Sequence, residues 1–434
     1  MPDQHSVTPG SSTKNSTPRL AVLLLWYPLF TQPFIFRDIE ALKQHLPVHV
    51  YTLYGRNLRL CSREMCQAAD EATRLGIRAL PRILWSVLRL AFRHPVRLVR
   101  LFADNVCCRW SSLEILGENL WAFLCGLHLA PLLQKEGIDL LYAPWPRGTT
   151  TAARTIFQCT GIGYVTSARG DNLNPADPDL VVKLRDACAV RTNNQADAGR
   201  IRDLLAGTTS HGRTPQVAVI YNSLTLHVDR LAPLPMRPPV RLLAAGRFDV
   251  TKGFDVLLRA CAELARNNVD FSLTLVGGGG AMMGLGKLDS TLHALCRDLH
   301  LEDRVTFPGL VSHDTFPDIL RAHDIFAAPC VIAPTGQRDG IPNTVIEAMS
   351  FGLPVVASNV NALPEIVRHR ETGLLVPPGN PTLLALALQE LIDHPEQARC
   401  YGARAAQLAR ELFSQQTNGS QLASLFIQAH RERT

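Results

Sequence analysis

Two acidic residues eight positions apart, Asp339 and Glu347, form the pattern in this sequence that suggests chemistry most clearly. Pro342 lies between them and can begin a helix, because the first helical residue needs no amide donor. Asp339 would then lie in the loop before the helix, and Glu347 on its second turn. The two carboxylates could accept hydrogen bonds from different hydroxyl pairs of one ligand. Composition alone also allows a simpler interpretation, in which Glu347 is a solvated helix residue.

Two cations, Arg247 and Lys252, occupy a short segment between a predicted strand, 241–245, and a predicted helix, 254–265. Cations at the entrance of a helix suit a pyrophosphate, which gains charge-assisted hydrogen bonds and the favourable helix dipole. We expect both side chains on an exposed loop. A solvated loop without a ligand is an equally good interpretation of the spacing.

A second predicted strand, 271–276, runs directly into four glycines, of which Gly277 and Gly278 are the first two. Backbone without side chains can approach a ligand closely. No G-x-G-x-x-G frame fits between Gly277 and Gly286, so the segment is not a dinucleotide fingerprint. A flexible glycine loop is the alternative.

Taken in order, these segments resemble the C-terminal domain of family 4 glycosyltransferases, which have the GT-B fold. The resemblance runs from about residue 240 to 378. It implies that Arg247 and Lys252 hold the diphosphate of a nucleotide-sugar donor and that Glu347 binds the donor ribose. Asp339 would contact the transferred sugar, although the family usually has glutamate there. The implied catalytic residues are Asp339, Arg247 and Lys252; the donor site would also include Gly277, Gly278, Gly340, Ile341, Pro342, Asn343 and Glu347.

The resemblance implies a retaining, metal-independent transfer of a hexosyl group to a glycan or lipid-linked acceptor, in bacterial surface polysaccharide synthesis. No cofactor and no metal are expected. Asp177 and Asp179 form a D-x-D string, the metal signature of another glycosyltransferase fold, but they lie away from the donor motifs and we interpret them as coincidence. Two alternatives stay open: a nucleotide-sugar-binding protein without transfer activity, and a related nucleotide-sugar epimerase.

The N-terminal half resembles the family less closely, through residues 141–153 and 165–171. Many relatives carry a histidine in the second segment, where this chain has Arg169. We therefore place Arg169 and Asp171 on the acceptor side, with Arg169 stabilising the leaving phosphate or an anionic acceptor. A structural salt bridge between Arg169 and Asp171 or another acid is the alternative.

Strands and helices alternate along both halves of the chain, which predicts doubly wound α/β domains with parallel sheets. Residues 1–18 are polar and read as a disordered lead-in. We expect a Rossmann-like N-terminal domain over 19–225, a proline-rich linker over 226–239, and a Rossmann-like C-terminal domain over 240–400. Helices in 401–434 are expected to return to the N-terminal domain. The strands are predicted at 20–26, 48–53, 138–142, 163–167, 187–192, 217–221, 241–245, 271–276, 305–307, 325–328, 354–357 and 374–376.

Positive charge is concentrated in one part of the chain. Eleven arginines, no lysine and four acids lie between Arg56 and Arg109, whereas the whole chain has a net charge of +6. The segment from Arg74 to Arg109 has the pattern of basic amphipathic helices, which can lie on an anionic bilayer. An arginine-rich surface over a core is the alternative, and no nucleic-acid-binding module accompanies the charge. The scattered cysteines favour reduced thiols, so we expect a cytoplasmic protein, peripheral on the inner face of the cytoplasmic membrane.

Overall fold

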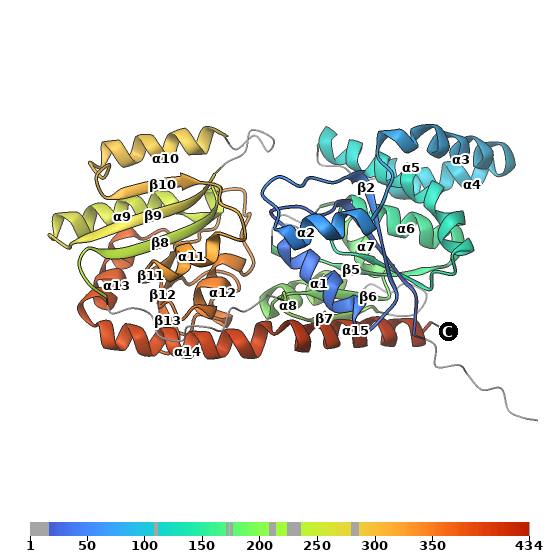
Figure 1. Ribbon diagram of the computed structural model, residues 1–434. Coiled ribbons are helices and arrows are strands. Elements are labelled where there is room, and N and C mark those ends of the chain that lie inside the picture. Colours follow the sequence, from blue (N-terminus) through green and yellow to red (C-terminus); the bar gives the residue numbers. More distant parts are fainter. Residues whose placement is uncertain are drawn as a thin grey trace, which may run out of the picture.

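The computed structural model of the 434-residue chain describes residues 17–107, 112–170, 173, 177–207, 214–223, 236–278 and 286–433. Asp171, Arg109, most of the N-terminal lead-in and most of the linker, all of which carried expectations, lie outside the described residues. The described chain forms two α/β domains side by side, with the last two helices running along both (Figure 1).

The N-terminal domain is built on a parallel seven-stranded sheet of order β3-β2-β1-β4-β5-β6-β7. Its central strands are continuous apolar runs, as expected for a sheet covered on both faces. The strands are β1 (Leu20–Trp26), β2 (Val48–Gly55), β3 (Thr73–Arg74), β4 (Leu140–Ala143), β5 (Gly163–Ser167), β6 (Ala189–Thr192) and β7 (Gln216–Val219). The short edge strand β3 was not predicted from the sequence.

The C-terminal domain has a parallel six-stranded sheet of order β10-β9-β8-β11-β12-β13. Its strands are β8 (Val240–Arg247), β9 (Phe271–Gly278), β10 (Val305–Gly309), β11 (Ile325–Ala328), β12 (Val355–Ser358) and β13 (Gly373–Val376). In both sheets the strand order reverses near the centre, between β1 and β4 and between β8 and β11. Ligands of doubly wound sheets bind beyond the carboxyl ends of strands at such points.

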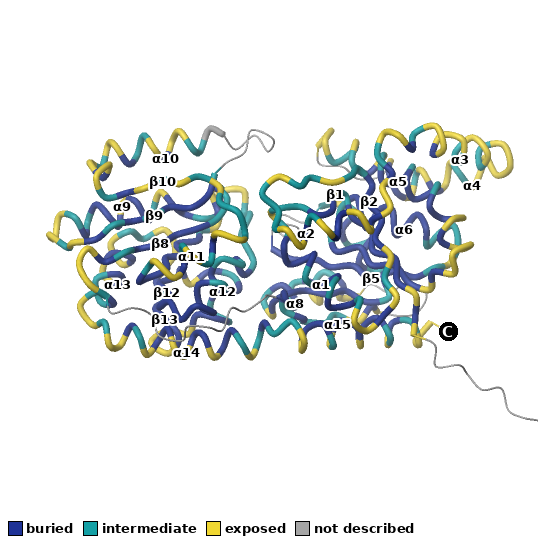
Figure 2. The backbone as a smooth tube through the Cα atoms, viewed as in Figure 1, coloured by how far each residue is buried: buried dark blue, intermediate teal, exposed yellow. Residues whose placement is uncertain are grey.

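Helices cover both sheets, which form the buried interior of each domain (Figure 2). The N-terminal domain contains α1 (Pro33–Lys43), α2 (Arg63–Ala68), α3 (Leu80–Arg93), α4 (Pro95–Phe102), α5 (Leu113–Lys135), α6 (Gly148–Thr160), α7 (Leu180–Arg185) and α8 (Gln195–Leu205). The C-terminal domain contains α9 (Phe254–Arg266), α10 (Gly286–Asp298), α11 (Phe316–Arg321), α12 (Asn343–Ser350) and α13 (Pro381–Asp393). The predicted fold class, two doubly wound parallel domains, is confirmed.

The last two helices join the domains. Helix α14 (Pro395–Phe413) begins before residue 401, where the returning helices were expected to start. It packs on α12 and therefore belongs mainly to the C-terminal domain. Helix α15 (Gln415–Arg431) lies on α1 of the N-terminal domain, where Phe426 meets Tyr142 edge to face at 5.0 Å. Gly419 is needed there, because a Cβ on it would lie only 2.7 Å from the Cβ of Ala41.

Among the described helices, α5 alone is long and apolar enough to cross a membrane. It packs along α6 and beneath α3, and 44% of its most apolar window is buried inside the protein. These contacts are those of a core helix in the N-terminal domain.

Candidate functional site

Two adjoining cavities, of about 200 and 460 Å³, lie between the domains. Both are lined by Arg247, Lys252, Pro342 and Asn343 of the C-terminal domain, and Thr31 of the N-terminal domain closes both. The smaller cavity continues to Glu347, and the larger one to Asp339 and the strand ends of the N-terminal domain. The topology therefore brings together all three C-terminal segments singled out in the sequence.

Lys252 and Asp339, to which separate tasks were assigned, form an ion pair and a hydrogen bond with each other. The expectation of an exposed loop is wrong for both cations: the Lys252 side chain is only 11% exposed, and Arg247 is the half-buried last residue of β8. A 3-10 turn capped by the Asp249 carboxylate holds the lysine against the loop before α12. Burial favours the neutral forms of both groups, but their mutual attraction outweighs it. The pKa of Lys252 is therefore raised, and that of Asp339 is lowered with additional help from Arg247.

Gly277 lies where β9 runs closest to β8. Its φ is 150°, and a Cβ there would lie 1.9 Å from the carbonyl oxygen of Gly246. Packing between the two strands therefore requires this glycine, which also lines the smaller cavity. Gly278 lines neither cavity and lies near Leu310. The next two glycines of the run lie outside the described residues.

Helix α12 begins at Asn343, so Pro342 is its N-cap and not its first helical residue as predicted. The Thr344 hydroxyl donates to the Ala245 carbonyl at 2.9 Å and ties the helix to the end of β8. Ile341 is buried in the core beneath it. Gly340 lies beside Gly170 of the other domain: a Cβ on Gly170 would be 3.0 Å from the Gly340 nitrogen.

Glu347 points into the smaller cavity from the second turn of α12. Its nearest cation is Arg37 of α1, with Nη1 3.8 Å from Oε1, a contact between the domains. Burial raises the pKa of Glu347, and the charge of Arg37 only partly offsets this. A desolvated carboxylate with one distant cation keeps most of its capacity to accept hydrogen bonds from a ligand.

Part of the lining of the smaller cavity is apolar and is here called the apolar slot. Leu310, Val311 and Phe316 line it, and the rings of Phe30 and His313 meet across the domains at 4.8 Å. His313 Nε2 lies 2.7 Å from the Phe30 carbonyl oxygen, and burial lowers the pKa of His313. A flat apolar ligand group fits this slot, with Glu347 beside it. No local pattern in the sequence predicted these residues, because they come from two separate domains.

Arg169 follows β5 and forms part of the N-terminal wall of the larger cavity. Its side chain is almost fully buried and donates to the Asn222 Oδ1 at 2.7 Å. The guanidinium also lies over the rings of Phe34 and Trp145, 4.8 and 4.9 Å from their centroids. Its expected neighbour Asp171 is outside the described residues. Trp145, directly after β4, was missed in the sequence although its position after a strand was the available signal.

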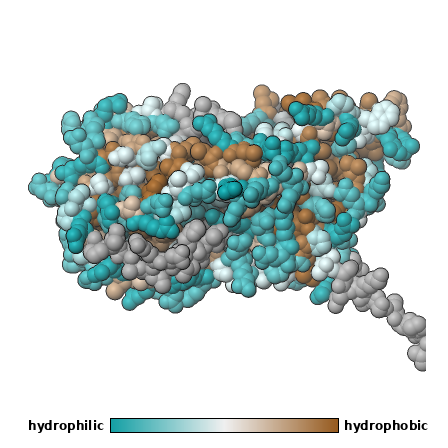
Figure 3. Space-filling view, viewed as in Figure 1, coloured by the Kyte–Doolittle hydropathy of each residue, from teal (hydrophilic) through white to brown (hydrophobic). Residues whose placement is uncertain are grey.

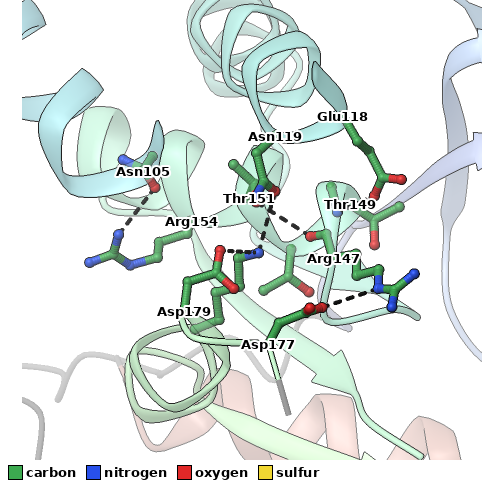
Figure 4. A network of polar contacts seen from close by, with 12 residues as sticks. Asn105, Glu118, Asn119, Arg147, Thr149, Thr151, Arg154, Asp177 and Asp179 are labelled. Carbon is green, nitrogen blue, oxygen red and sulfur yellow. Dashed lines mark hydrogen bonds and ion pairs between the residues drawn. The ribbon is translucent and has the colours of Figure 1, made fainter. Parts of the chain in front are cut away.

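The D-x-D string belongs to a polar network inside the N-terminal domain (Figure 4). Asp177 accepts from Arg147 Nε at 3.1 Å, and Asp179 pairs with the buried Lys183 at 2.7 Å. Burial lowers the pKa of Lys183 despite the charge of Asp179. The two aspartates thus help to hold the loop before α7 in place inside the N-terminal domain. Of Arg147, Asp177, Asp179 and Lys183, Arg147 alone lines the larger cavity, as does Glu118.

Solved structures define the class of this fold. The chain aligns over 94% of its length with 98% of Anabaena HepE in complex with UDP and glucose, at 19% identity and a TM-score of 0.67. It aligns over the same shares with sucrose-phosphate synthase from Thermosynechococcus elongatus, at 20% identity and a TM-score of 0.70. The fold is GT-B, as the sequence motifs predicted.

Family and sequence comparisons agree with this class. Residues 239–394 match the family model for Glycosyl transferases group 1, which confirms the predicted resemblance for the C-terminal domain. The chain is 30% identical over 230 residues to a protein named as the colanic acid biosynthesis glycosyltransferase WcaL of Escherichia coli K12, covering 52% of this chain and 55% of that one. Amylovoran biosynthesis glycosyltransferase AmsK of Erwinia amylovora is 33% identical over 36% of this chain and 37% of its own. The chain thus spans about half the length, or less, of these curated relatives.

Proposed function

We propose that the chain is a glycosyltransferase that moves a hexosyl group from a nucleotide-sugar donor to a glycan or lipid-linked acceptor, in bacterial surface polysaccharide synthesis. The observation that carries the proposal is the order of groups along the two cavities. The apolar slot and the Glu347 carboxylate line the smaller cavity, Arg247 and Lys252 line both cavities, and Asp339 lines the larger one. A base, a ribose, a diphosphate and a sugar follow one another in the same order along a nucleotide sugar.

The proposed reaction retains configuration at the anomeric carbon. Arg247 and Lys252 stabilise the charge that develops on the leaving diphosphate, and a donor phosphate oxygen helps to deprotonate the acceptor hydroxyl. The remaining contribution of the protein is to hold donor and acceptor in reactive geometry between the two domains, where Thr31 and Pro342 line both cavities. Asp339 contacts the transferred sugar and sets the position of Lys252.

The proposed reaction needs no metal, because two protein cations lie where the diphosphate charge is expected. The D-x-D aspartates are engaged with Arg147 and Lys183 and lie in the other domain. Activity should therefore persist in excess chelator. Complete loss of transfer in chelator, restored by Mg²⁺ or Mn²⁺, would contradict this part of the proposal.

A screen of nucleotide sugars by thermal shift tests the proposed function. A donor present at 100 times its dissociation constant should stabilise the protein by about 2.7 kcal/mol. Turnover of that donor with and without acceptor then separates the three activities. A transferase needs the acceptor, an epimerase turns over the donor alone, and a binding protein does neither.

We further propose that the protein is cytoplasmic and attaches to the inner face of the membrane through α3 and α4. Their outer surface, here called the α3–α4 face, exposes large apolar side chains among arginines: Leu84, Trp85, Leu88, Phe92, Val96 and Val99. Phe92 is 87% and Trp85 68% exposed, and apolar and hydrophilic groups alternate at this end of the molecule (Figure 3). Arg97 of α4 instead donates to the carbonyl oxygens of Gln158 and Cys159. Apolar anchors among cations fit an anionic interface better than water.

A further inference from the structure

The larger cavity carries more positive charge than a nucleotide-sugar donor requires. Within the part of the chain that the structure describes, its charged lining consists of the cations Arg147, Arg169, Arg247, Lys252 and Arg338 and the acids Glu118 and Asp339. Arg247 and Lys252 are assigned to the donor diphosphate in the proposed function. Among the described lining residues, three arginines therefore remain for the part of the cavity that would hold the sugars, against the acid Glu118 once Lys252 and Asp339 are counted as a pair.

Arg338 is the most telling of the three. Its Nε is buried and has no hydrogen-bond partner among the described residues. Asp197 attracts Arg338 by its charge but makes no hydrogen bond to it: Oδ2 accepts from the Gly170 amide at 2.8 Å and from Asn194 Nδ2 at 2.6 Å, and the buried Oδ1 has no hydrogen-bond partner among the described residues. Burial lowers the pKa of Arg338, and the like charge of Arg200 adds to this effect. A buried donor on a charged group is costly until a ligand satisfies it.

The other two arginines already have roles inside the protein. Arg147 is held by Asp177, and Arg169 lies between Phe34 and Trp145 and donates to Asn222. Both nevertheless line the cavity and add to its positive potential. Arg338 directly precedes Asp339, so an anion that Arg338 binds would lie beside the sugar that Asp339 contacts.

We propose that this cavity takes a sugar that carries a carboxylate or a phosphate, and that Arg338 is the residue that binds this anionic group. The inference rests on the proposed function and narrows its substrate class. A guanidinium offers a planar pair of donors that matches a carboxylate or phosphate, whereas a neutral sugar would leave its charge uncompensated. The anionic group can belong either to the sugar of the donor or to the acceptor.

Matched neutral and acidic ligands test the proposal on the full-length protein. In the donor arm, UDP-glucose is compared with UDP-glucuronate by titration calorimetry. In the acceptor arm, methyl glucoside is compared with methyl glucuronide and with glucose 6-phosphate by NMR titration, with and without UDP. The variants are Arg338→Gln and Arg338→Lys, with Arg200→Gln as the control that removes a neighbouring charge outside the cavity lining.

We expect one arm to prefer its acidic ligand at least about tenfold, the usual scale of a charge-assisted hydrogen bond. Arg338→Gln should abolish the preference, Arg338→Lys should keep part of it, and Arg200→Gln should leave it intact. The arm that responds identifies the source of the anion. Equal binding of neutral and acidic ligands in both arms, or a preference that survives Arg338→Gln, would overturn the proposal.

If the proposed glycosyltransferase function is wrong, the same binding measurements should give a different result. The protein would then bind no nucleoside diphosphate at Arg247 and Lys252, while the acceptor arm without UDP would still report on Arg338. Thermal unfolding of each variant checks that a lost preference does not reflect a lost fold.

Discussion

The two walls of the cleft are built in different ways. The C-terminal wall takes most of its polar groups from two short stretches, Arg247 to Lys252 and Gln337 to Glu347, each continuous in sequence, and His313 lies outside both. The N-terminal wall combines Phe34 of α1, Trp145 and Arg147 after β4, and Arg169 after β5. One wall is thus local in sequence and can be recognised from motifs, whereas the other is assembled by topology. Only the first lies within the segment that matches a family model.

Loss of Lys252 should have the largest effect, because it acts on the fold and on the ligand together. Lys252→Ala leaves the largely buried Asp339 without its partner, so we expect a stability loss on the order of 2–3 kcal/mol, below the cost of breaking a fully buried pair. Urea denaturation at neutral pH measures it. Nucleoside diphosphate affinity, measured by calorimetry, should also fall.

The pH dependence of this loss has a definite sign. The pKa of Asp339 is lowered in the folded protein, so its stabilising contribution is present above the ordinary carboxyl range and disappears as pH falls through the folded value. The difference between wild type and Lys252→Ala should therefore shrink in acid. In the Lys252→Ala/Asp339→Ala double variant the losses should be less than additive, and strict additivity would show that the pair contributes nothing.

Arg247→Ala should separate binding from stability on the same wall. A lost charge-assisted contact costs about 1.5–3 kcal/mol, so nucleoside diphosphate should bind roughly ten- to a hundredfold more weakly. The melting temperature should stay within error, because Arg247 is only half-buried at the end of β8. Arg259→Ala, an exposed arginine on α9, is the matched control. Unchanged affinity in Arg247→Ala would remove the phosphate role.

A smaller effect is expected on the N-terminal wall from Arg169→Lys. Lysine keeps the charge but loses the planar guanidinium that lies over Phe34 and Trp145 and donates to Asn222. The KM for the acceptor should rise several-fold while nucleoside diphosphate affinity stays constant. Steady-state kinetics with varied acceptor measures this. An equal loss of nucleotide affinity would mean that the two walls do not divide the substrates as proposed.

The smallest effect on the isolated enzyme is expected from the α3–α4 face. Trp85→Ser and Phe92→Ser remove two exposed anchors, so binding to phosphatidylglycerol-containing vesicles should weaken while activity on a soluble acceptor is unchanged. Vesicle sedimentation at low and physiological salt measures this, since screening shortens to about 8 Å at physiological ionic strength. Wild-type protein that ignores anionic vesicles even at low salt would refute the attachment.

The same contrast explains what could be predicted from the sequence. The alternation of strand and helix patterns predicted both sheets, because the periodicity of apolar residues and the residue types of turns are local properties of the sequence. Arg247, Lys252, Asp339 and Glu347 were predicted to share one donor site because the ordered motifs that contain them resemble the C-terminal domain of family 4 glycosyltransferases. The Lys252–Asp339 pair was not predicted, since it joins residues 87 positions apart through side-chain packing.

Contacts between the domains were equally invisible in the sequence. Arg37 near Glu347 and Phe30 against His313 depend on how the two domains lie together. Which apolar side chains of α3 and α4 are exposed was not predicted either, because an amphipathic pattern does not say which apolar residues face the core. Tertiary packing decides each of these features.

The division of work between the two acids of the C-terminal wall is the central claim. Asp339→Asn should lower the transfer rate at least tenfold, because its contact with the sugar is needed most in the transition state. The same change releases Lys252, so nucleoside diphosphate affinity should be kept or increased. Glu347→Gln is the matched comparison and should weaken nucleotide and nucleotide sugar alike.

The most direct test is to measure the transfer rate and the nucleoside diphosphate affinity of Asp339→Asn on one preparation. Our account predicts slow transfer together with undiminished nucleotide binding. Transfer and nucleotide affinity that fall in parallel would contradict it, and would reduce Asp339 to a support for Lys252.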